Sequence, residues 1–132
     1  MGRNVDELRP EYCYKCRIRP EDVVDGDTVD CEIDLGMQTF RVERLRLFGI
    51  NAPEVRGEQK VQGKKATAFL IKLLTEHSLD SGGSFIIRTH KDKRGKYGRF
   101  LAEIFGVAKR GRAALNLNQE MVRRGHAVKA RY

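Results

Sequence analysis

Apolar and polar side chains alternate strictly between residues 28 and 35, which is the clearest structural pattern in the chain. The apolar residues take every second position, with polar residues between them: Val29, Cys31, Ile33 and Leu35 alternate with Thr28, Asp30, Glu32 and Asp34. A period of two is typical of a β-strand with one buried face. Gly36 interrupts the pattern and a second strand over about 38–50 follows, so we expect a hairpin across a short loop.

Other segments also predict extended structure. Residues 12–18 are rich in aromatic and β-compatible side chains and are followed by Pro20. Residues 84–90 and 99–105 predict a second hairpin around a basic turn, and residues 128–132 predict a last extended segment. Together with the first hairpin, these segments supply enough strands for a sheet that closes on itself.

Helical periodicity occurs in two places. In the first, apolar residues recur at i, i+3, i+4, i+7 and i+8: Ala66, Phe69, Leu70, Leu73 and Leu74. This spacing predicts an amphipathic helix over about 64–77, and residues 115–124 predict a shorter helix that Gly125 ends. The expected fold class is mainly β with helices (α+β). It is a five-stranded Greek-key barrel of the oligonucleotide/oligosaccharide-binding (OB-fold) type, with one helix after the third strand and a short C-terminal helix.

The chain of 132 residues is long enough for one domain with a modest core. We expect a flexible N-terminal lead-in over residues 1–11 and one barrel domain over residues 12–132. No apolar run approaches the roughly 20 residues of a membrane-spanning helix, so no membrane partner is expected. Residues 1–10 contain no basic segment followed by an apolar one, which favours a cytoplasmic protein; a secreted protein whose leader has been removed remains open.

An excess of basic residues gives the chain a formal net charge of +8 at pH 7. Such a charge favours a polyanionic partner, either nucleic acid or an anionic membrane surface. A basic amphipathic helix would favour the membrane, whereas the basic residues are densest in the turn at residues 91–99. Nucleic acid is therefore the expected partner, and no feature indicates an obligate protein partner.

Three cysteines, Cys13, Cys16 and Cys31, are a poor framework for disulfides because their number is odd. Cys13 and Cys16 have the spacing of half a zinc site, but no second close pair of ligands follows. A strand over residues 12–18 would also direct these two side chains to opposite faces. We therefore favour reduced, half-buried cysteines, with structural zinc as the alternative.

Four charged residues lie next to segments that should bury apolar faces: Asp27, Arg46, Glu54 and Arg99. Asp27 ends the inward-facing row of the first hairpin strand, which predicts a carboxylate at a mouth of the barrel. Arg46 leaves its strand on the face opposite Leu45 and Leu47. Singly, each has an ordinary explanation in a turn or on a solvated surface. Together, two carboxylates and two guanidinium groups suit metal-assisted attack on a phosphodiester.

Three sequence motifs carry these residues in order. They are Val-Asp-Gly-Asp-Thr-Val at 24–29, Arg-Leu-Phe-Gly-Ile-Asn-Ala-Pro-Glu at 46–54 and Lys-Tyr-Gly-Arg at 96–99, with a weaker motif at 121–127. In these motifs the chain closely resembles the thermonuclease (staphylococcal nuclease-like) family, over residues 12–132. The resemblance implies a calcium-dependent endonuclease that hydrolyses phosphodiester bonds of DNA and RNA, with single strands preferred. It also implies 5′ P–O cleavage that leaves 3′-phosphates.

The resemblance further implies catalytic and substrate-binding roles. Glu54 matches the position usually assigned as general base toward the attacking water. Arg46 and Arg99 match the two arginines that bind the phosphate and stabilise its transition state. Lys96 and Tyr97 match positions that flank the bound nucleotide. The neighbouring members of the same basic turn are expected to follow the nucleic-acid backbone: these are Lys93 and Arg94.

The metal site implied by the resemblance departs from the family pattern. Asp27 matches the principal carboxylate ligand of calcium, and Asn51 and the backbone carbonyl of Ala52 complete the expected set. Asn51 stands where the family commonly has a second aspartate, and Ala52 where it commonly has threonine. An amide is a legitimate calcium ligand, but a neutral one should bind more weakly than a carboxylate. The sequence therefore predicts a calcium site of reduced affinity.

A non-catalytic OB-fold module that binds single-stranded nucleic acid is the alternative function, because one fold can support both activities. The presence of Arg46, Glu54 and Arg99 together favours the enzyme. The neutral side chain of Asn51 favours the alternative.

Overall fold

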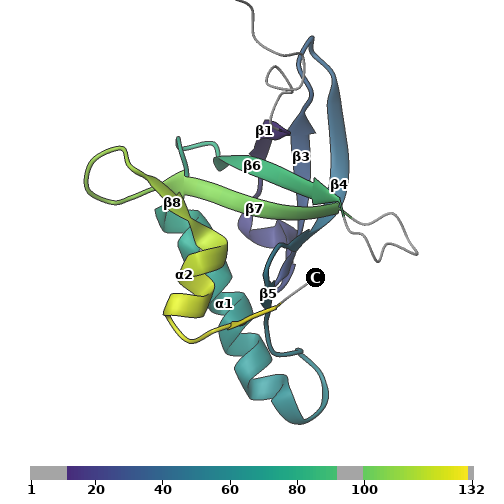
Figure 1. Ribbon diagram of the computed structural model, residues 1–132, viewed down its shortest axis with the longest axis vertical. Helices are drawn as coiled ribbons and strands as arrows, with labels where there is room; N and C mark the ends of the chain where they lie inside the picture. The colour runs from purple at the N-terminus through teal and green to yellow at the C-terminus, as the bar shows by residue number, and fades with distance from the viewer. Residues whose placement is uncertain (1–11, 92–99, 131–132) are drawn as a thin grey trace, which may run out of the picture.

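The computed structural model describes residues 12–91 and 100–130, and the expected lead-in over residues 1–11 lies outside these ranges. Five strands form a barrel (Figure 1): β1 (Cys13–Arg17), β3 (Thr28–Asp34), β4 (Phe40–Leu47), β6 (Ser84–Lys91) and β7 (Phe100–Val107). Neighbouring strands follow the order β1–β6–β7–β4–β3, and β3 also pairs with β1, which closes the ring. All of these pairings are antiparallel except that of β4 with β7. The predicted five-stranded Greek-key barrel is therefore confirmed.

Both predicted hairpins are present. In the first, β3 and β4 pair continuously from Thr28 opposite Arg46 to Asp34 opposite Phe40. In the second, β6 and β7 pair from Ile86 opposite Phe105 onward. The first hairpin extends from one end of the barrel, whereas both helices lie at the other end (Figure 1).

The strand predicted over about 38–50 does not continue to residue 50, so that part of the prediction is wrong. Strand β4 ends at Leu47, because Gly49 adopts a left-handed backbone conformation (φ 80°) that turns the chain. Strand β5 (Ile50–Asn51) then leaves the barrel and pairs with β9 (Val128–Lys129), within the last predicted extended segment. Two further short strands were not predicted: β2 (Val23–Asp25) pairs with β3, and β8 (Ala114–Asn116) pairs with β7.

The two predicted helices are confirmed with different starting points. Helix α1 (Lys60–Glu76) begins earlier than predicted and follows the 3₁₀ turn η3 (Gly57–Gln59). Helix α2 (Leu117–Arg123) begins later than predicted, because the side chain of Asn116 caps it by accepting a hydrogen bond from the backbone N–H of Gln119 (3.2 Å). A second 3₁₀ turn, η2 (Pro20–Asp22), connects β1 to β2. No helix within residues 12–91 and 100–130 is long and apolar enough to cross a membrane.

The core fills the barrel and the space beneath α1 and α2. Its large buried side chains from the barrel strands and both helices include Val29, Leu45, Leu47, Leu70, Phe85, Ile87, Ile104, Leu117 and Met121. Cys16 and Cys31 are also buried there, whereas Cys13 is exposed, so the spacing of Cys13 and Cys16 does not bring them together. A hydrogen bond with Cys16, reinforced by burial, raises the pKa of the Cys31 thiol and keeps it protonated.

One buried amide connects α2 to the barrel. The Nδ2 group of Asn118 donates to the carbonyl oxygens of Phe48 and Ala102, both at 2.9 Å. Its Oδ1 atom accepts from the backbone N–H of Ile104 at 3.1 Å. These bonds satisfy a side chain that is only 2% exposed, and they hold the end of β4 against β7.

Candidate active site

Three segments meet where β3 begins and β4 ends. Thr28 lies opposite Arg46 in the hairpin, and the backbone carbonyl of Asp27 accepts from the N–H of Leu47 at 2.8 Å. The turn at Gly49 then brings β5 back, with Asn51 on it, toward the start of β3. This backbone arrangement places an acidic, a basic and an amide side chain next to one another.

Asp27 is the buried centre of this group, with only 6% of its surface exposed. Its Oδ2 atom accepts from the backbone N–H of Ala52 at 2.9 Å, and its Oδ1 atom accepts from the hydroxyl of Thr28 at 3.1 Å. The first bond joins residues that are far apart in the sequence. Asp27 therefore fixes the loop that carries Asn51 and Ala52.

Arg46 bridges the two other side chains. Its guanidinium group donates to Oδ1 of Asn51, and its Nη2 atom lies 3.6 Å from Oδ2 of Asp27. The adjacent residues Leu45 and Leu47 are fully buried, which leaves Arg46 on the opposite face of β4, as its position in the strand predicted. Arg46, Asp27 and Asn51 thus form one connected cluster.

Asp25 also belongs to the cluster, although the sequence indicated only a turn residue there. Its Oδ1 atom accepts from the backbone N–H of Asp27 at 3.0 Å. Burial raises the pKa of Asp25, and a side-chain hydrogen bond with the Asp27 carboxyl raises it further. The available signal was a second carboxylate two residues before Asp27 in the same turn.

Two glycines allow helix α1 to approach the cluster closely. A Cβ atom on Gly26 would lie 2.7 Å from Cβ of Ala52 and 2.8 Å from Cβ of Ala66 in α1. A Cβ atom on Gly63, also in α1, would lie 2.1 Å from the backbone oxygen of Glu54. The helix therefore supports both the Asp25–Asp27 turn and the backbone of Glu54, whose side chain is exposed.

The basic turn between β6 and β7 lies outside the described residues, and with it five predicted site residues: Lys93, Arg94, Lys96, Tyr97 and Arg99. Their roles remain predictions. The chain re-enters the described part at Phe100, which pairs with Leu45, the residue before Arg46. Phe100, the residue that follows Arg99, therefore lies on β7, the strand next to the one that carries Arg46.

The oxygen atoms of the cluster suit a hard cation. Asp25 and Asp27 supply two neighbouring carboxylates, and Asn51 and the carbonyl of Ala52 could add neutral oxygen ligands. Within the described ranges there is no group of three or more histidine, cysteine, aspartate or glutamate residues that could hold a metal ion. The candidate ligands of the cluster are all oxygen atoms, a type that suits calcium better than zinc, and two of them are neutral.

A family model described as staphylococcal nuclease homologue matches residues 44–132, about two thirds of the chain. The chain belongs to this family. The match includes Arg46, Asn51, Glu54 and Arg99, whereas Asp25 and Asp27 precede it. A comparison with curated proteins gives no match. Membership indicates a nuclease-like protein and is consistent with the barrel.

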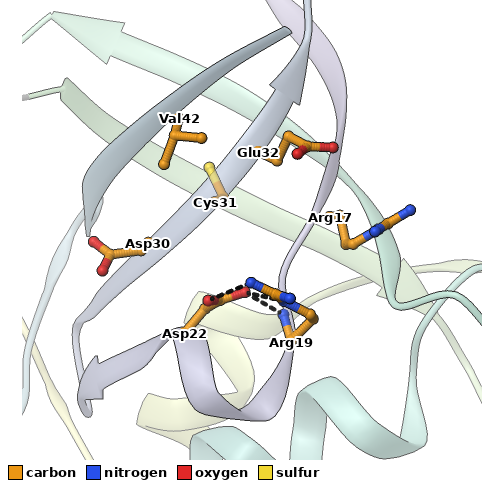
Figure 2. A pocket seen from close by; sticks show the side chains of 7 residues that line it. All are labelled: Arg17, Arg19, Asp22, Asp30, Cys31, Glu32 and Val42. Atoms are coloured by element: carbon orange, nitrogen blue, oxygen red, sulfur yellow. Dashed lines mark hydrogen bonds and ion pairs between the residues drawn. The ribbon is translucent and has the colours of Figure 1, made fainter.

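A separate small hollow in this staphylococcal nuclease homologue has a volume of about 110 Å³. Figure 2 shows its lining: Arg17, Arg19, Asp22, Asp30, Cys31, Glu32 and Val42. Arg19 donates to Asp22 through its backbone N–H (2.9 Å) and through Nε (3.2 Å), and Asp30 accepts from Arg44 at 2.8 Å. Because Asp22 and Asp30 are paired within the protein and the three lining carboxylates outnumber the two lining guanidinium groups, this hollow does not favour a phosphate.

Proposed function

We propose that this protein is a calcium-dependent endonuclease that hydrolyses phosphodiester bonds in single-stranded DNA and RNA. The observation that carries the proposal is the contact of Arg46 with both Asp27 and Asn51 at one end of the barrel. A guanidinium group for phosphate and oxygen ligands for a cation are thus adjacent in a member of a nuclease family. The net charge of +8 favours the approach of a polyanion.

The cluster would bind the cation and the phosphate together. Asp25 and Asp27, with Asn51 and the carbonyl of Ala52, would hold calcium. When bound, calcium would supply positive charge that offsets the charge developing on the phosphate during attack. Arg46 would bind two phosphate oxygens at once, because the planar guanidinium matches their geometry.

Glu54 would act as the general base. Its side chain is exposed on the loop after β5, where a water molecule can reach it, while its backbone lies against α1. The attacking water would transfer a proton to Glu54 as its oxygen bonds to phosphorus. The bond between phosphorus and the 5′-oxygen would break, the released 5′-oxygen would take up a proton from water to become a hydroxyl, and a 3′-phosphate would remain. Arg99 would supply the second guanidinium group, and residues 93–97 would contact the flanking strand.

The test is cleavage of denatured DNA with calcium or with an excess of chelator. We expect calcium-dependent degradation to products that end in a 3′-phosphate, and we expect Glu54→Gln to reduce the rate by about 10²–10⁴-fold, the range for loss of general-base catalysis. Glu58→Gln is the matched control, because Glu58 is an exposed glutamate in η3 on the same loop. Tight binding without cleavage under all conditions would instead establish the non-catalytic binding module.

Replacing Asn51 with aspartate is expected to tighten calcium binding by about tenfold, because a further carboxylate joins the ligand set. The new carboxylate could still accept from Arg46, which now donates to Asn51. Isothermal titration calorimetry measures the affinity, and Gln38→Glu adds the same charge at an exposed position in the distant β3–β4 loop. Equal or weaker binding by the Asn51 variant would contradict calcium coordination at this position.

A further inference from the structure

Two adjoining hollows lie on the outer face of β7, next to the candidate active site. The first has a volume of about 580 Å³ and includes Phe48 and Lys129; the second has a volume of about 500 Å³ and includes Phe105 and Arg88. They share a wall made of four side chains: Glu103, Asn116, Gln119 and Arg123. Both volumes lie within the usual range of roughly 300–1,000 Å³ for small-ligand sites.

The first hollow begins close to the cluster. Phe48 follows Arg46 by two residues, and Ile50, which also lines the hollow, is adjacent to Asn51. On β7, Leu101 lies beside Arg46, and Glu103 in the shared wall follows two residues later. Two residues of a strand span about 7 Å, so a nucleotide attached to a phosphate at Arg46 can reach this hollow.

The aromatic side chains in both hollows are held in position. The ring of Phe48 stacks on that of His90, with centroids 3.9 Å apart and planes 10° apart. His90 in turn hydrogen-bonds through Nε2 to Oε1 of Glu103 at 2.8 Å. In the second hollow, the guanidinium of Arg88 lies 5.3 Å from the ring centroid of Phe105. Rings that are already ordered lose little entropy when a ligand packs against them.

Each carboxylate that lines the hollows is offset by an arginine: Glu103 forms an ion pair with Arg88, and Glu120, in the second hollow, forms one with Arg123. Glu103 accepts hydrogen bonds from Arg88 (3.0 Å) and Asn116 (2.9 Å) as well as from His90. Burial alone would raise the pKa of Glu103, but these bonds outweigh it and the pKa is lowered. Arg123, which donates to Glu120 through Nε and Nη2, and Lys129 are both exposed, and Gln119 presents an exposed amide. The hollows thus combine rings and amides with two internal ion pairs and the exposed ammonium group of Lys129.

We propose that the two hollows are subsites for successive bases of the single strand that leaves the scissile phosphate at Arg46. The proposal rests on the proposed function, because it takes that strand to be the substrate. Single-stranded nucleic acid is bound by rings on which bases stack and by basic groups near the backbone, with little dependence on sequence. The strand would run from Arg46 past Phe48 to Phe105.

The experiment measures binding by fluorescence anisotropy in the presence of a chelator, so that no cleavage is required. The probes are a labelled oligothymidylate and the same strand with two adjacent abasic positions, moved along the strand in a series. We expect the abasic pair in the best position to weaken binding by at least tenfold, since one base–aromatic stack contributes roughly 1–3 kcal/mol. Phe105→Ala should weaken binding of the intact probe by about tenfold and should reduce its preference over the abasic probe.

Gln119→Ala provides a second variant at an exposed residue of the shared wall, where folding is not at risk. It should weaken binding of the intact probe by about threefold, as expected for one lost hydrogen bond. Phe40→Ala, at an exposed phenylalanine on the β3–β4 hairpin, is the control and should leave binding unchanged. The subsites are overturned if the affinity is the same with and without the abasic positions. They are also overturned if neither Phe105→Ala nor Gln119→Ala changes the affinity. If calcium-dependent cleavage is still observed in that case, the proposed nuclease activity stands without the subsites. If binding depends on the bases but no cleavage occurs, the subsites stand and the nuclease activity is rejected.

Discussion

Replacing Arg46 with lysine is expected to slow cleavage of denatured DNA by about 10²–10³-fold, the loss typical of one preorganised charge at a transition state. Lysine keeps the positive charge but cannot contact two phosphate oxygens with a planar fork. It also cannot bridge Asp27 and Asn51 as the guanidinium does. Because the interaction is strongest in the transition state, kcat and kcat/KM should fall together.

Arg44→Lys is a closely matched control for this variant. Arg44 precedes Arg46 by two residues on the same face of β4, but it pairs with Asp30, with Nε and Oδ1 2.8 Å apart. Initial rates at saturating calcium, together with urea unfolding to verify that each variant folds, measure the effect. A rate for Arg46→Lys within threefold of the unmodified protein, or an equal loss for Arg44→Lys, would show that Arg46 does not bind the reacting phosphate.

Replacing Gly63 with alanine should both destabilise the protein and reduce its activity. In an unobstructed helix this change stabilises by about 1 kcal/mol. Here the new Cβ atom would lie 2.1 Å from the backbone oxygen and 2.4 Å from the backbone carbon of Glu54, so α1 and the Glu54 loop must separate. We expect a loss of about 1–3 kcal/mol in the free energy of unfolding, as in other overpacked sites. Misplacing Glu54 by about 1 Å should lower kcat/KM by as much as 10²-fold.

Gly82→Ala tests whether any glycine replacement would do the same. A Cβ atom at Gly82 would have the Oδ1 atom of the Asp80 side chain as its nearest neighbour, at 3.3 Å, and a side chain can move more easily than backbone. Urea unfolding and steady-state kinetics on both variants provide the comparison. Increased stability of Gly63→Ala with normal activity would mean that the Glu54 loop is not positioned by α1.

The barrel could be predicted because its strands carry their own periodic signal. Residues 28–35 alternate and bury Val29, Cys31 and Ile33, and the apolar spacing of residues 66–74 marks the buried face of α1. The first turn of α1 was missed because its buried residue is Gly63, which has no side chain to contribute to an apolar pattern. Gly63 is buried because it lies close to the Glu54 backbone, and the spacing of apolar residues in the sequence does not indicate such a contact.

The candidate site was predictable in its residue types but not in its contacts. The motifs indicated Asp27, Arg46 and Asn51, yet the bond from Ala52 to Asp27 depends on the register of β3 with β4 and on the turn at Gly49. Neither is encoded within one local segment. The shared wall of the two hollows escaped prediction for the same reason, since Glu103 and Asn116 meet only after β8 has paired with β7.

The parallel pairing of β4 with β7 has a consequence for how the protein acquires activity during synthesis. Leu45 and Phe100 are neighbours in the barrel, but α1 and β6 lie between them in the sequence, so this contact cannot form until all of these elements have been synthesised. The amide of Asn118, which holds the two strands together, is translated later still. A nascent chain that has emerged only as far as β7 therefore carries most of the proposed cleavage machinery without the bonds that hold it in place. Under the proposed function, hydrolysis of RNA near the ribosome would be postponed until α2 has been made.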